Sequence, residues 1–258
     1  MKIAIIGAGN MGGATALGLA GALPDARITV TAKHAATLEK FAARGLQTSL
    51  DNVSAAADAD VVVLGVKPWL AQGVLAELKP ALAGKVLVSF VAGVPGAEML
   101  TWLDGSGIAG AYSVIPNLAI EVGESMSFIQ ELCGTPETLA TVRGLFDAVG
   151  RTAVVDEKRL NAGMMLASCG IAFALRYVRA SAEGGVELGL YPQEALDAAL
   201  QTVRGAAALL AARGTHPEAE IDRVTTPGGI TIKGLNAMEE AGFSAAVIAG
   251  LKAWKPKQ

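Results

Sequence analysis

The sequence predicts an α/β protein in which a doubly wound sheet is followed by an all-helical C-terminal domain. Over residues 1–156, short apolar segments with strand character alternate with helical segments, which is typical of a parallel sheet covered by helices. After about Asp156 the strand pattern stops and only helical segments follow. We therefore expect two domains, 1–156 and 157–258, that differ in class.

The first domain contains several short apolar runs, each of which we interpret as a strand. Residues 61–66 read Val-Val-Val-Leu-Gly-Val without a polar side chain, as expected for a strand covered on both faces. The expected strands are 2–6, 28–31, 61–66, 86–91, 108–114, 125–129 and 152–155. The helices expected between them are 11–23, 34–44, 70–78, 97–103 and 136–148.

The second domain is expected to be helical throughout. Its expected helices are 158–188, 192–213, 218–224 and 243–254. The first of these is long for a globular helix, and its internal glycines could interrupt it. The small-residue stripe 205–208 and the apolar faces nearby exceed what such a domain can bury alone. We therefore expect a homodimer in which this domain pairs with a second copy of itself.

The composition describes a globular protein and argues against two kinds of partner. Of the 258 residues, 52% are apolar, and the net charge of -3 leaves no basic footprint for a nucleic acid. Residues 3–24 carry no charge, which superficially resembles a signal peptide or a membrane span. Six glycines interrupt that stretch, however, so we interpret it as a soluble strand, turn and helix and expect no membrane association.

Cysteine and histidine usage points to an intracellular protein without a metal. Cys133 and Cys169 form no C-x-x-C pair, so we expect both thiols as small core residues in a reducing cytoplasm. The two histidines, His34 and His216, lie far apart with no ligand spacing around them. We expect no metal site, and we place His216 at the exposed start of a helix.

A glycine-rich motif lies between the first expected strand and the first expected helix. It reads Gly7-Ala8-Gly9-Asn10-Met11-Gly12, a G-x-G-x-x-G pattern. In this context the first glycine makes a tight turn, the second lets a pyrophosphate approach the backbone, and the third lets the helix pack on the strand. The free amides of the helix start face the phosphates. We interpret residues 1–156 as a Rossmann-type dinucleotide-binding domain; the alternative is a glycine-rich turn that binds nothing.

The end of the second expected strand selects between NAD and NADP. An NAD site usually carries an acid there, which binds the ribose diol. This chain has no acid until Glu39, so Thr31, Lys33 or His34 could hold a 2′-phosphate. An acid at this place would cost NADPH binding about 1 kcal/mol or more. We therefore expect NADPH to be preferred, with NADH as the second cofactor; the alternative is that Lys33 and His34 belong to an ordinary solvated loop.

Two further strand ends point to the same crevice. Val66, Lys67 and Pro68 follow a central strand, at the edge where open α/β sheets bind ligands. Because Lys67 precedes a proline, its backbone is biased toward an extended conformation that lets its amide and ammonium face the crevice. Ala92 and Gly93 follow the next strand, and the glycine permits close approach of a nicotinamide. We expect all five residues to line the cofactor site.

The most distinctive loop lies between helical segments near the C-terminus. Its central residues are Thr226-Pro227-Gly228-Gly229-Ile230-Thr231. One interpretation is a helix start, with Thr225 or Thr226 as the cap and Pro227 at the first helical position. The other is an anion cradle, in which the glycines expose backbone amides to a small anion. We expect both: a helix start whose free amides face a carboxylate.

These motifs resemble those of the pyrroline-5-carboxylate reductase family, in order and along essentially the whole chain. The matching elements are Ile6-Gly7-Ala8-Gly9-Asn10-Met11, Val66-Lys67-Pro68, Ala92-Gly93, Pro116-Asn117 and Thr226-Pro227-Gly228-Gly229 followed by Thr231-Ile232. The resemblance implies that Asn52 contacts the nucleotide and that Asn117 belongs to the substrate site. It also implies NADPH-dependent reduction of (S)-1-pyrroline-5-carboxylate to L-proline, the last step of proline biosynthesis. Family dimers often assemble further into rings such as a decamer.

The chain departs from the family pattern at two places. The family usually reads M-P-N-T-P, whereas residues 115–119 here end in Leu118-Ala119. A family S-G-S-G-P-A-Y segment on the long helix appears here as residues 167–173, which lack the proline and the tyrosine hydroxyl. These departures weaken the expected substrate contacts from that helix. Ser168 is the residue expected to supply a displaced hydroxyl.

The resemblance also assigns roles around the substrate, a five-membered cyclic imine with a carboxylate. The amides of Gly228, Gly229 and Ile230 are expected to hold the carboxylate, with Thr226 nearby. Thr231 resembles the family threonine that hydrogen-bonds the ring nitrogen, and it is the expected catalytic residue. Because a threonine hydroxyl is a poor acid at neutral pH, an iminium already protonated from solvent is the expected hydride acceptor.

Two other functions remain open from the sequence. One is a different reductase of the same architecture, such as another imine reductase or a β-hydroxyacid dehydrogenase. Those enzymes generally rely on a lysine in the long helix, and residues 161–175 contain none. The other is a nicotinamide-binding sensor that has lost catalysis, for which the two departures are the only support.

Overall fold

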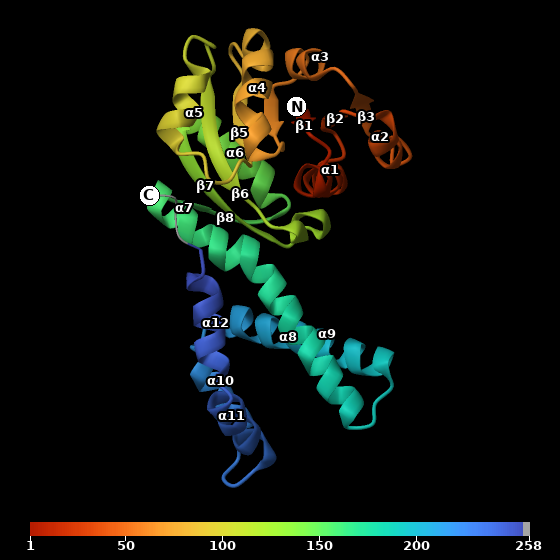
Figure 1. Ribbon diagram of the computed structural model, residues 1–258, viewed down its shortest axis with the longest axis vertical. Helices are drawn as coiled ribbons and strands as arrows, with labels where there is room; N and C mark the ends of the chain where they lie inside the picture. The colour runs from red at the N-terminus through yellow and green to blue at the C-terminus, as the bar shows by residue number, and fades with distance from the viewer. Residues whose placement is uncertain (255–258) are drawn as a thin grey trace. The chain divides into compact units, whose positions relative to one another are not determined.

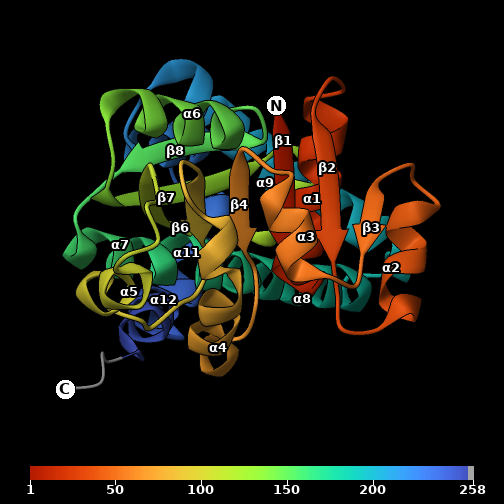
Figure 2. The same cartoon turned by 90° about the horizontal axis from the view of Figure 1, so that it is seen from above.

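The computed structural model describes residues 1–254 and contains one eight-stranded sheet in the order β3-β2-β1-β4-β5-β6-β7-β8 (Figures 1 and 2). The strands are β1 (Lys2–Ile6), β2 (Arg27–Thr31), β3 (Gln47–Ser49), β4 (Val61–Leu64), β5 (Val86–Ser89), β6 (Gly110–Ile115), β7 (Ser125–Cys133) and β8 (Gly150–Val154). The accompanying helices are α1 (Asn10–Ala22), α2 (Ala35–Ala42), α3 (Asn52–Ala57), α4 (Pro68–Leu78), α5 (Gly96–Leu103), α6 (Pro136–Asp147) and α7 (Glu157–Gly163), with short 3-10 turns η1 (Lys79–Ala81) and η2 (Leu118–Val122). The expected Rossmann-type architecture is confirmed.

The sheet is mixed rather than wholly parallel, which corrects one expectation. Strand β7 pairs antiparallel with β6, whereas the strands from β3 to β6 are all parallel and β8 is parallel to β7. The connection from Ile115 to Ser125 is shorter than the dozen or more residues that a parallel crossover needs. The chain therefore turns back through η2 and extends the sheet in the opposite direction.

Two apolar clusters cover the two faces of the sheet. Along β1, Ile3 and Ile5 belong to one cluster and Ala4 and Ile6 to the other, because successive side chains of a strand point to opposite faces. Helices α1, α2 and α6 contribute to the first cluster, and α3, α4 and α5 to the second. The sheet is thus doubly wound, as expected, and only its edges and strand ends remain for a ligand.

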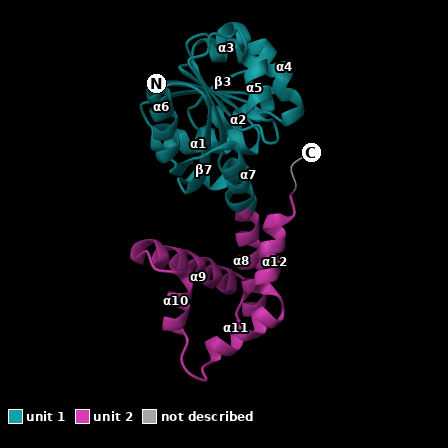
Figure 3. Ribbon diagram, turned by 90° about the vertical axis from the view of Figure 1, so that its left-hand side faces the viewer, with its two compact units in different colours: residues 1–169, 258 teal, residues 170–257 magenta. Residues whose placement is uncertain are grey.

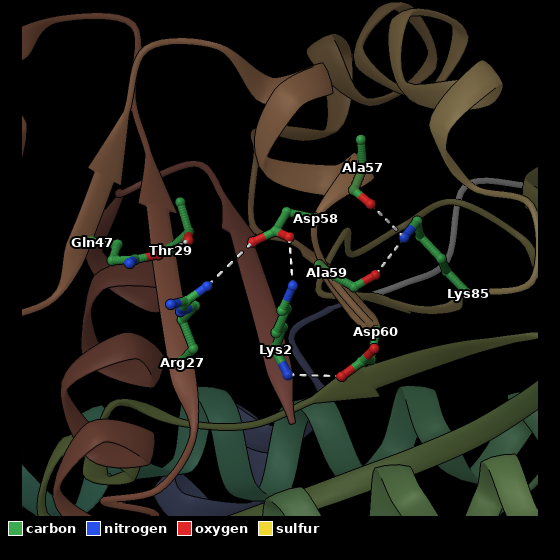
Figure 4. Close-up of polar contacts among 9 residues, drawn as sticks. All are labelled: Lys2, Arg27, Thr29, Gln47, Ala57, Asp58, Ala59, Asp60 and Lys85. Atoms are coloured by element: carbon green, nitrogen blue, oxygen red, sulfur yellow. Dashed lines mark hydrogen bonds and ion pairs between the residues drawn. The ribbon is translucent and has the colours of Figure 1, made fainter.

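Charged side chains occupy the amino ends of the central strands (Figure 4). Lys2 Nζ lies 2.6 Å from Asp58 Oδ1, and the amide of Lys2 donates to Asp60 at 2.8 Å. The hydrogen bond from Lys2 holds the pKa of the exposed Asp58 carboxyl below its ordinary value. Since parallel strands share their direction, this ionic cluster lies at the edge opposite to the glycine-rich turn. The cluster connects the amino ends of the strands, and its side chains lie away from the carboxyl ends, where the glycine-rich turn is located.

The first helical segment after the sheet consists of three helical pieces, whereas the sequence predicted one long helix. The expected helix 158–188 consists of α7, a π-helix (Met164–Cys169) and α8 (Gly170–Glu187). Both cysteines are free and half-buried rather than fully in the core. The π-helix packs with β7, and the chain divides into compact units at residue 169, whereas the expected domain boundary is residue 156 (Figure 3).

The second unit, from residue 170 onward, consists of helices. They are α8, α9 (Pro192–Arg213), α10 (Pro217–Val224), α11 (Ile230–Glu240) and α12 (Phe243–Lys252). Helix α8 packs on α9 and α12, and His216 caps α10 by accepting the amide of Glu218, as expected for a helix start. Glu220 is 8% exposed and binds Thr215 and Arg213, which lowers the pKa of its carboxyl.

Much of the apolar surface of this unit is open. Phe173, Leu175, Tyr177 and Val186 of α8 are each at least 37% exposed. The continuous helical run Glu157–Glu187 is long and apolar enough to cross a membrane, yet only 11% of its most apolar window is buried within the chain. Such a surface requires a partner or an apolar phase to cover it.

Candidate functional site

The glycine-rich turn has the geometry that a dinucleotide phosphate needs. Gly7 adopts a φ of +104°, which side chains rarely tolerate. A Cβ on Gly12 would overlap the carbonyl oxygen of Gly7, whereas a Cβ on Gly9 would meet nothing within 4 Å. Gly9 is also the N-cap of α1 and supplies no side chain to occupy the free amides of the helix. The turn is therefore tightly packed on its inner side and open where a phosphate would approach.

The end of β2 fastens this turn to the sheet. The amide of Ala8 donates to the carbonyl of Thr31 at 2.8 Å, and the amide of Gly7 donates to the Thr31 hydroxyl at 3.3 Å. That hydroxyl in turn donates to Oδ1 of Asn52 at 2.7 Å. Thr31 is fully buried, so the structure replaces its expected contact with a 2′-phosphate by an internal position behind Asn52.

Asn52 itself remains half-buried at the first residue of α3. Asp51 caps this helix by accepting the amide of Ser54 at 3.0 Å, which fixes the point where the chain turns over the end of β2. Neither β3 nor α3 was expected from the sequence, so the position of Asn52 came only from the family resemblance. Lys33 and His34 are exposed on the same strand exit, and their contact with a cofactor stays a prediction.

The other strand exits converge on the glycine-rich turn. Gly65 donates its amide to Ile6 at 2.8 Å, and a Cβ on Gly7 would lie 3.0 Å from the Gly65 carbonyl oxygen. Lys67 is extended (φ -66°, ψ 146°) as the N-cap of α4, with Pro68 at the first helical position. Lys67 therefore has the extended backbone conformation that the following proline predicts.

The remaining predicted cofactor residues lie along the same edge. Val66 is half-buried, and both Lys67 and Pro68 are exposed. Ala92 and Gly93 are exposed after β5, and Gly93 adopts a φ of +78°. Asn10 and Met11 begin α1, and Asn10 also borders a cavity of about 350 Å³ between α1, α2 and η2. Lys40, Arg44 and Glu121 line that cavity, and no sequence motif marks these three residues.

Asn117 connects two segments that are far apart in the sequence. Its side-chain oxygen accepts the amide of Ala119 at 3.0 Å, and its Nδ2 donates to the carbonyl of Ala167 at 3.3 Å. The side chain is 7% exposed, so its amide stabilises the chain internally, while a substrate contact stays a prediction. The bond brings η2 to the π-helix that carries the half-buried Ser168. π-Helical turns occur frequently at functional sites.

The distinctive loop of the second unit forms a tight turn directly before α11. The amide of Gly229 donates to the carbonyl of Thr226 at 2.9 Å, with Pro227 and a positive-φ Gly228 (+70°) between them, as in a type II turn. Gly229 is the N-cap and Ile230 the first helical residue. The expectation that Pro227 begins the helix was wrong, because the turn takes up the proline. The expected helix start is confirmed, whereas the expectation that free glycine amides face a carboxylate stays a prediction.

This turn presents both backbone and side chains. Ile230 is 88% exposed, and Thr231 is the second helical residue with an exposed side chain. A Cβ on Gly229 would overlap the Thr226 hydroxyl, so glycine is needed to close the turn. The first amides of a helix have no partner within it and form a natural anion site. Among residues 1–254, no cluster of side chains could hold a metal ion.

Comparisons with known proteins agree with these two parts. A family model described as pyrroline-5-carboxylate reductase dimerisation matches residues 157–257, and one described as NADP oxidoreductase coenzyme F420-dependent matches residues 2–93. The pyrroline-5-carboxylate reductase of Arabidopsis thaliana is 38% identical over 97% of this chain and 93% of its own length. That of Methanosarcina acetivorans is 36% identical over 95% and 92%. The chain spans only 48% of pyrroline-5-carboxylate reductase 1 of Dictyostelium discoideum, at 33% identity.

Solved structures agree over the whole fold. The pyrroline carboxylate reductase of Plasmodium falciparum with NADP bound matches with a TM-score of 0.87 at 25% identity, over 98% of this chain and 95% of that one. The pyrroline-5-carboxylate reductase of Coxiella burnetii gives 0.85 at 28%, over 97% and 94%. An imine reductase of Streptomyces aurantiacus gives 0.57 at 19% and shares the fold alone. This chain therefore belongs to the pyrroline-5-carboxylate reductase family.

Proposed function

We propose that this protein reduces (S)-1-pyrroline-5-carboxylate to L-proline with NADPH, the last step of proline biosynthesis. The observation that carries the proposal is the pairing of a dinucleotide turn with an amide-lined turn before α11 in one chain. Both turns lie within the part of the chain that matches the pyrroline-5-carboxylate reductase family. No feature of the site favours a hydroxyacid substrate, since residues 161–175 lack the lysine that such enzymes generally use.

The residues present fit a dinucleotide. The open side of Gly9, the free amides at the start of α1 and the absence of an acid in its first turn all suit a pyrophosphate. Lys33 and His34 are exposed just after β2, the strand whose last residue, Thr31, is hydrogen-bonded to Asn52, and they suit a 2′-phosphate. NADPH supplies the hydride when bound. The protein's contribution is then to orient the nicotinamide through the exits at Val66–Pro68 and Ala92–Gly93.

The turn before α11 is the proposed carboxylate site. The predicted donors to the anion are the amides of Gly228, Gly229 and Ile230. Because the Gly229 amide already donates to the Thr226 carbonyl, the amides of Gly228 and Ile230 are the ones left to hold the anion without a cation, and the Thr226 hydroxyl lies beside them. Thr231, one residue into the helix, hydrogen-bonds the ring nitrogen and fixes the face of the imine. The ring nitrogen takes its proton from solvent before reduction, because a threonine hydroxyl at neutral pH does not give one up readily. Positioning of this kind is worth up to about 7–11 kcal/mol in well-oriented reactions.

Steady-state reduction tests the proposed activity directly. NADPH oxidation, followed by absorbance, should begin on addition of pyrroline-5-carboxylate, with a higher kcat/KM for NADPH than for NADH. The matched control is 1-pyrroline, which has the same ring without the carboxylate and should show a markedly lower kcat/KM. Equal efficiency with both imines would contradict the carboxylate site. NADPH binding without any reduction would instead support a non-catalytic sensor.

The protein is further proposed to act as a cytoplasmic homodimer. The family carries its dimerisation domain at residues 157–257, and the exposed apolar residues of α8 lie within that region. A second copy is therefore the proposed cover of the apolar run Glu157–Glu187, in place of a membrane. Assembly of dimers into a ring such as a decamer is the larger form of this proposal. The two free thiols support a reducing compartment.

Sedimentation velocity at micromolar concentration should show a dimer or a multiple of dimers, with no monomer boundary. The physical reason is that the exposed apolar side chains of α8 lose contact with water only when a second copy covers them. Leu175→Glu places a charge on that face and should shift the distribution toward monomer. Lys33→Glu, a charge change in the other unit, is the matched control and should leave it unchanged. A wild-type monomer would overturn this assembly.

A further inference from the structure

Gly7, Thr31 and Asn52 form a hydrogen-bonded network behind the glycine-rich turn, and Thr31 is its buried member. Thr31 is fully buried at the end of β2, yet it carries a hydroxyl. The Gly7 amide donates to that hydroxyl at 3.3 Å, and the hydroxyl donates to Asn52 Oδ1 at 2.7 Å. The hydrogen bonds therefore run in one direction, from the glycine-rich turn through Thr31 to Asn52.

This direction fixes which part of the Asn52 amide is left for a ligand. A neutral side-chain amide has an oxygen that only accepts and a nitrogen that only donates. Because Oδ1 of Asn52 can only accept, the Thr31 hydroxyl must direct its one proton at that oxygen, while it accepts from the Gly7 amide. The amide oxygen is thereby occupied, and the Nδ2 group is the part that remains available. Asn52 therefore offers donors at the carboxyl end of β2.

Donors at this place distinguish the two cofactors. The acid usually found there in NAD sites is an acceptor that binds the ribose hydroxyls. A 2′-phosphate has only acceptor oxygens, so an amide that presents its Nδ2 group suits it, and an amide that presents its oxygen does not. The exposed Lys33 on the same strand exit adds a positive charge that also favours the 2′-phosphate, and the exposed His34 beside it adds a ring N–H donor.

We propose that Thr31 is a positioning residue for cofactor selection, which holds Asn52 with its Nδ2 group toward the 2′-phosphate of NADPH. It acts through Asn52 and touches no part of the cofactor. The inference rests on the proposed use of NADPH. It adds that the preference depends on a buried hydroxyl behind the site as well as on the exposed Lys33 and His34.

The test is a double-mutant cycle on cofactor affinity. Thr31→Val has the same shape without the hydroxyl, and it should raise the Kd of NADPH about tenfold while the Kd of NADH changes by less than about twofold. Thr31→Ser keeps the hydroxyl and should stay within about threefold of wild type for both. In an Asn52→Ala background, Thr31→Val should have no further effect, because interacting residues are not additive. Titration calorimetry measures each Kd, and thermal unfolding confirms that the variants are folded.

Two results would overturn the proposal. Equal losses for NADPH and NADH in Thr31→Val would mean that the hydroxyl only stabilises the turn at Gly7. An undiminished effect of Thr31→Val in the Asn52→Ala background would mean that it does not act through Asn52. If Thr31→Val fails to fold, Asn52→Asp decides, since it replaces the donors by acceptors and should weaken NADPH at least tenfold more than NADH. Absence of imine reduction with these affinities intact would reject the proposed activity and leave this inference standing.

Discussion

Replacing Gly12 by alanine is expected to destroy the nucleotide site and to destabilise the fold. The added Cβ would overlap the carbonyl oxygen of Gly7, and a backbone atom cannot swing aside as a side chain can. Overpacking of this kind costs about 1–3 kcal/mol and sometimes more. The turn must then open, and NADPH affinity should fall by about a hundredfold, or roughly 2.8 kcal/mol. Thermal unfolding and titration calorimetry measure the two effects.

Gly9→Ala is expected to lower NADPH affinity without lowering the stability of the fold, and so distinguishes the two effects predicted for Gly12→Ala. A Cβ on Gly9 meets nothing within 4 Å, so the unfolding temperature should stay close to that of the wild type. The methyl group would nevertheless stand where the pyrophosphate approaches the backbone, and NADPH affinity should fall by about tenfold. A Gly9→Ala protein that binds NADPH normally would show that the phosphates do not lie at this turn.

Thr231→Ala is expected to lower turnover by about tenfold or more, the scale of one lost hydrogen bond of about 1.4 kcal/mol in the transition state. The physical reason is that the imine loses the hydrogen bond that orients its ring nitrogen. Thr231 lies in the second unit, at the second residue of α11, and the glycine-rich turn lies in the first. NADPH affinity should therefore remain near that of the wild type. Turnover at saturating substrate and calorimetric NADPH affinity together check the prediction.

Thr225→Ala is the matched control for Thr231→Ala. The Thr225 hydroxyl is turned back onto its own helix, where it donates to the carbonyls of Ile221 and Asp222. Its loss should leave turnover within about twofold of the wild type, because no partner outside the helix is removed. Equal losses from both substitutions, or unchanged turnover in Thr231→Ala, would remove Thr231 from the mechanism.

The strands of the first domain could be predicted because their burial on both faces leaves continuous apolar runs. Residues 61–66 show this best, since every residue of β4 is buried. Strand β3 was missed because Gln47–Ser49 is a short, polar edge strand with one paired side. The six-residue α3 was missed because it spans less than two turns, and its alanines give no clear periodicity. The amide of Asn52 therefore could not be placed by pattern alone.

Other errors concern geometry that leaves no local signal. The antiparallel direction of β7 depends on the length of the connection from Ile115 to Ser125 and not on any residue type within it. The π-helix depends on a change of hydrogen-bond partner that no residue type specifies. The burial of Thr31 follows from contacts that are distant in sequence, because Gly7 and Asn52 enclose its hydroxyl at the end of β2. The exposed glycines of the turn before α11 could be predicted because their chemistry is local.

The turn before α11 is closed by a hydrogen bond between Thr226 and Gly229, three residues apart. The surface that this turn exposes is therefore formed by the contiguous residues 226–231, and the bond that closes it does not depend on residues distant in the sequence. Changes elsewhere in the helical domain, such as those at residues 167–173, can accumulate without reshaping it. If the proposed carboxylate site is correct, this segment grafted ahead of another helix should bind a small carboxylate on the new scaffold.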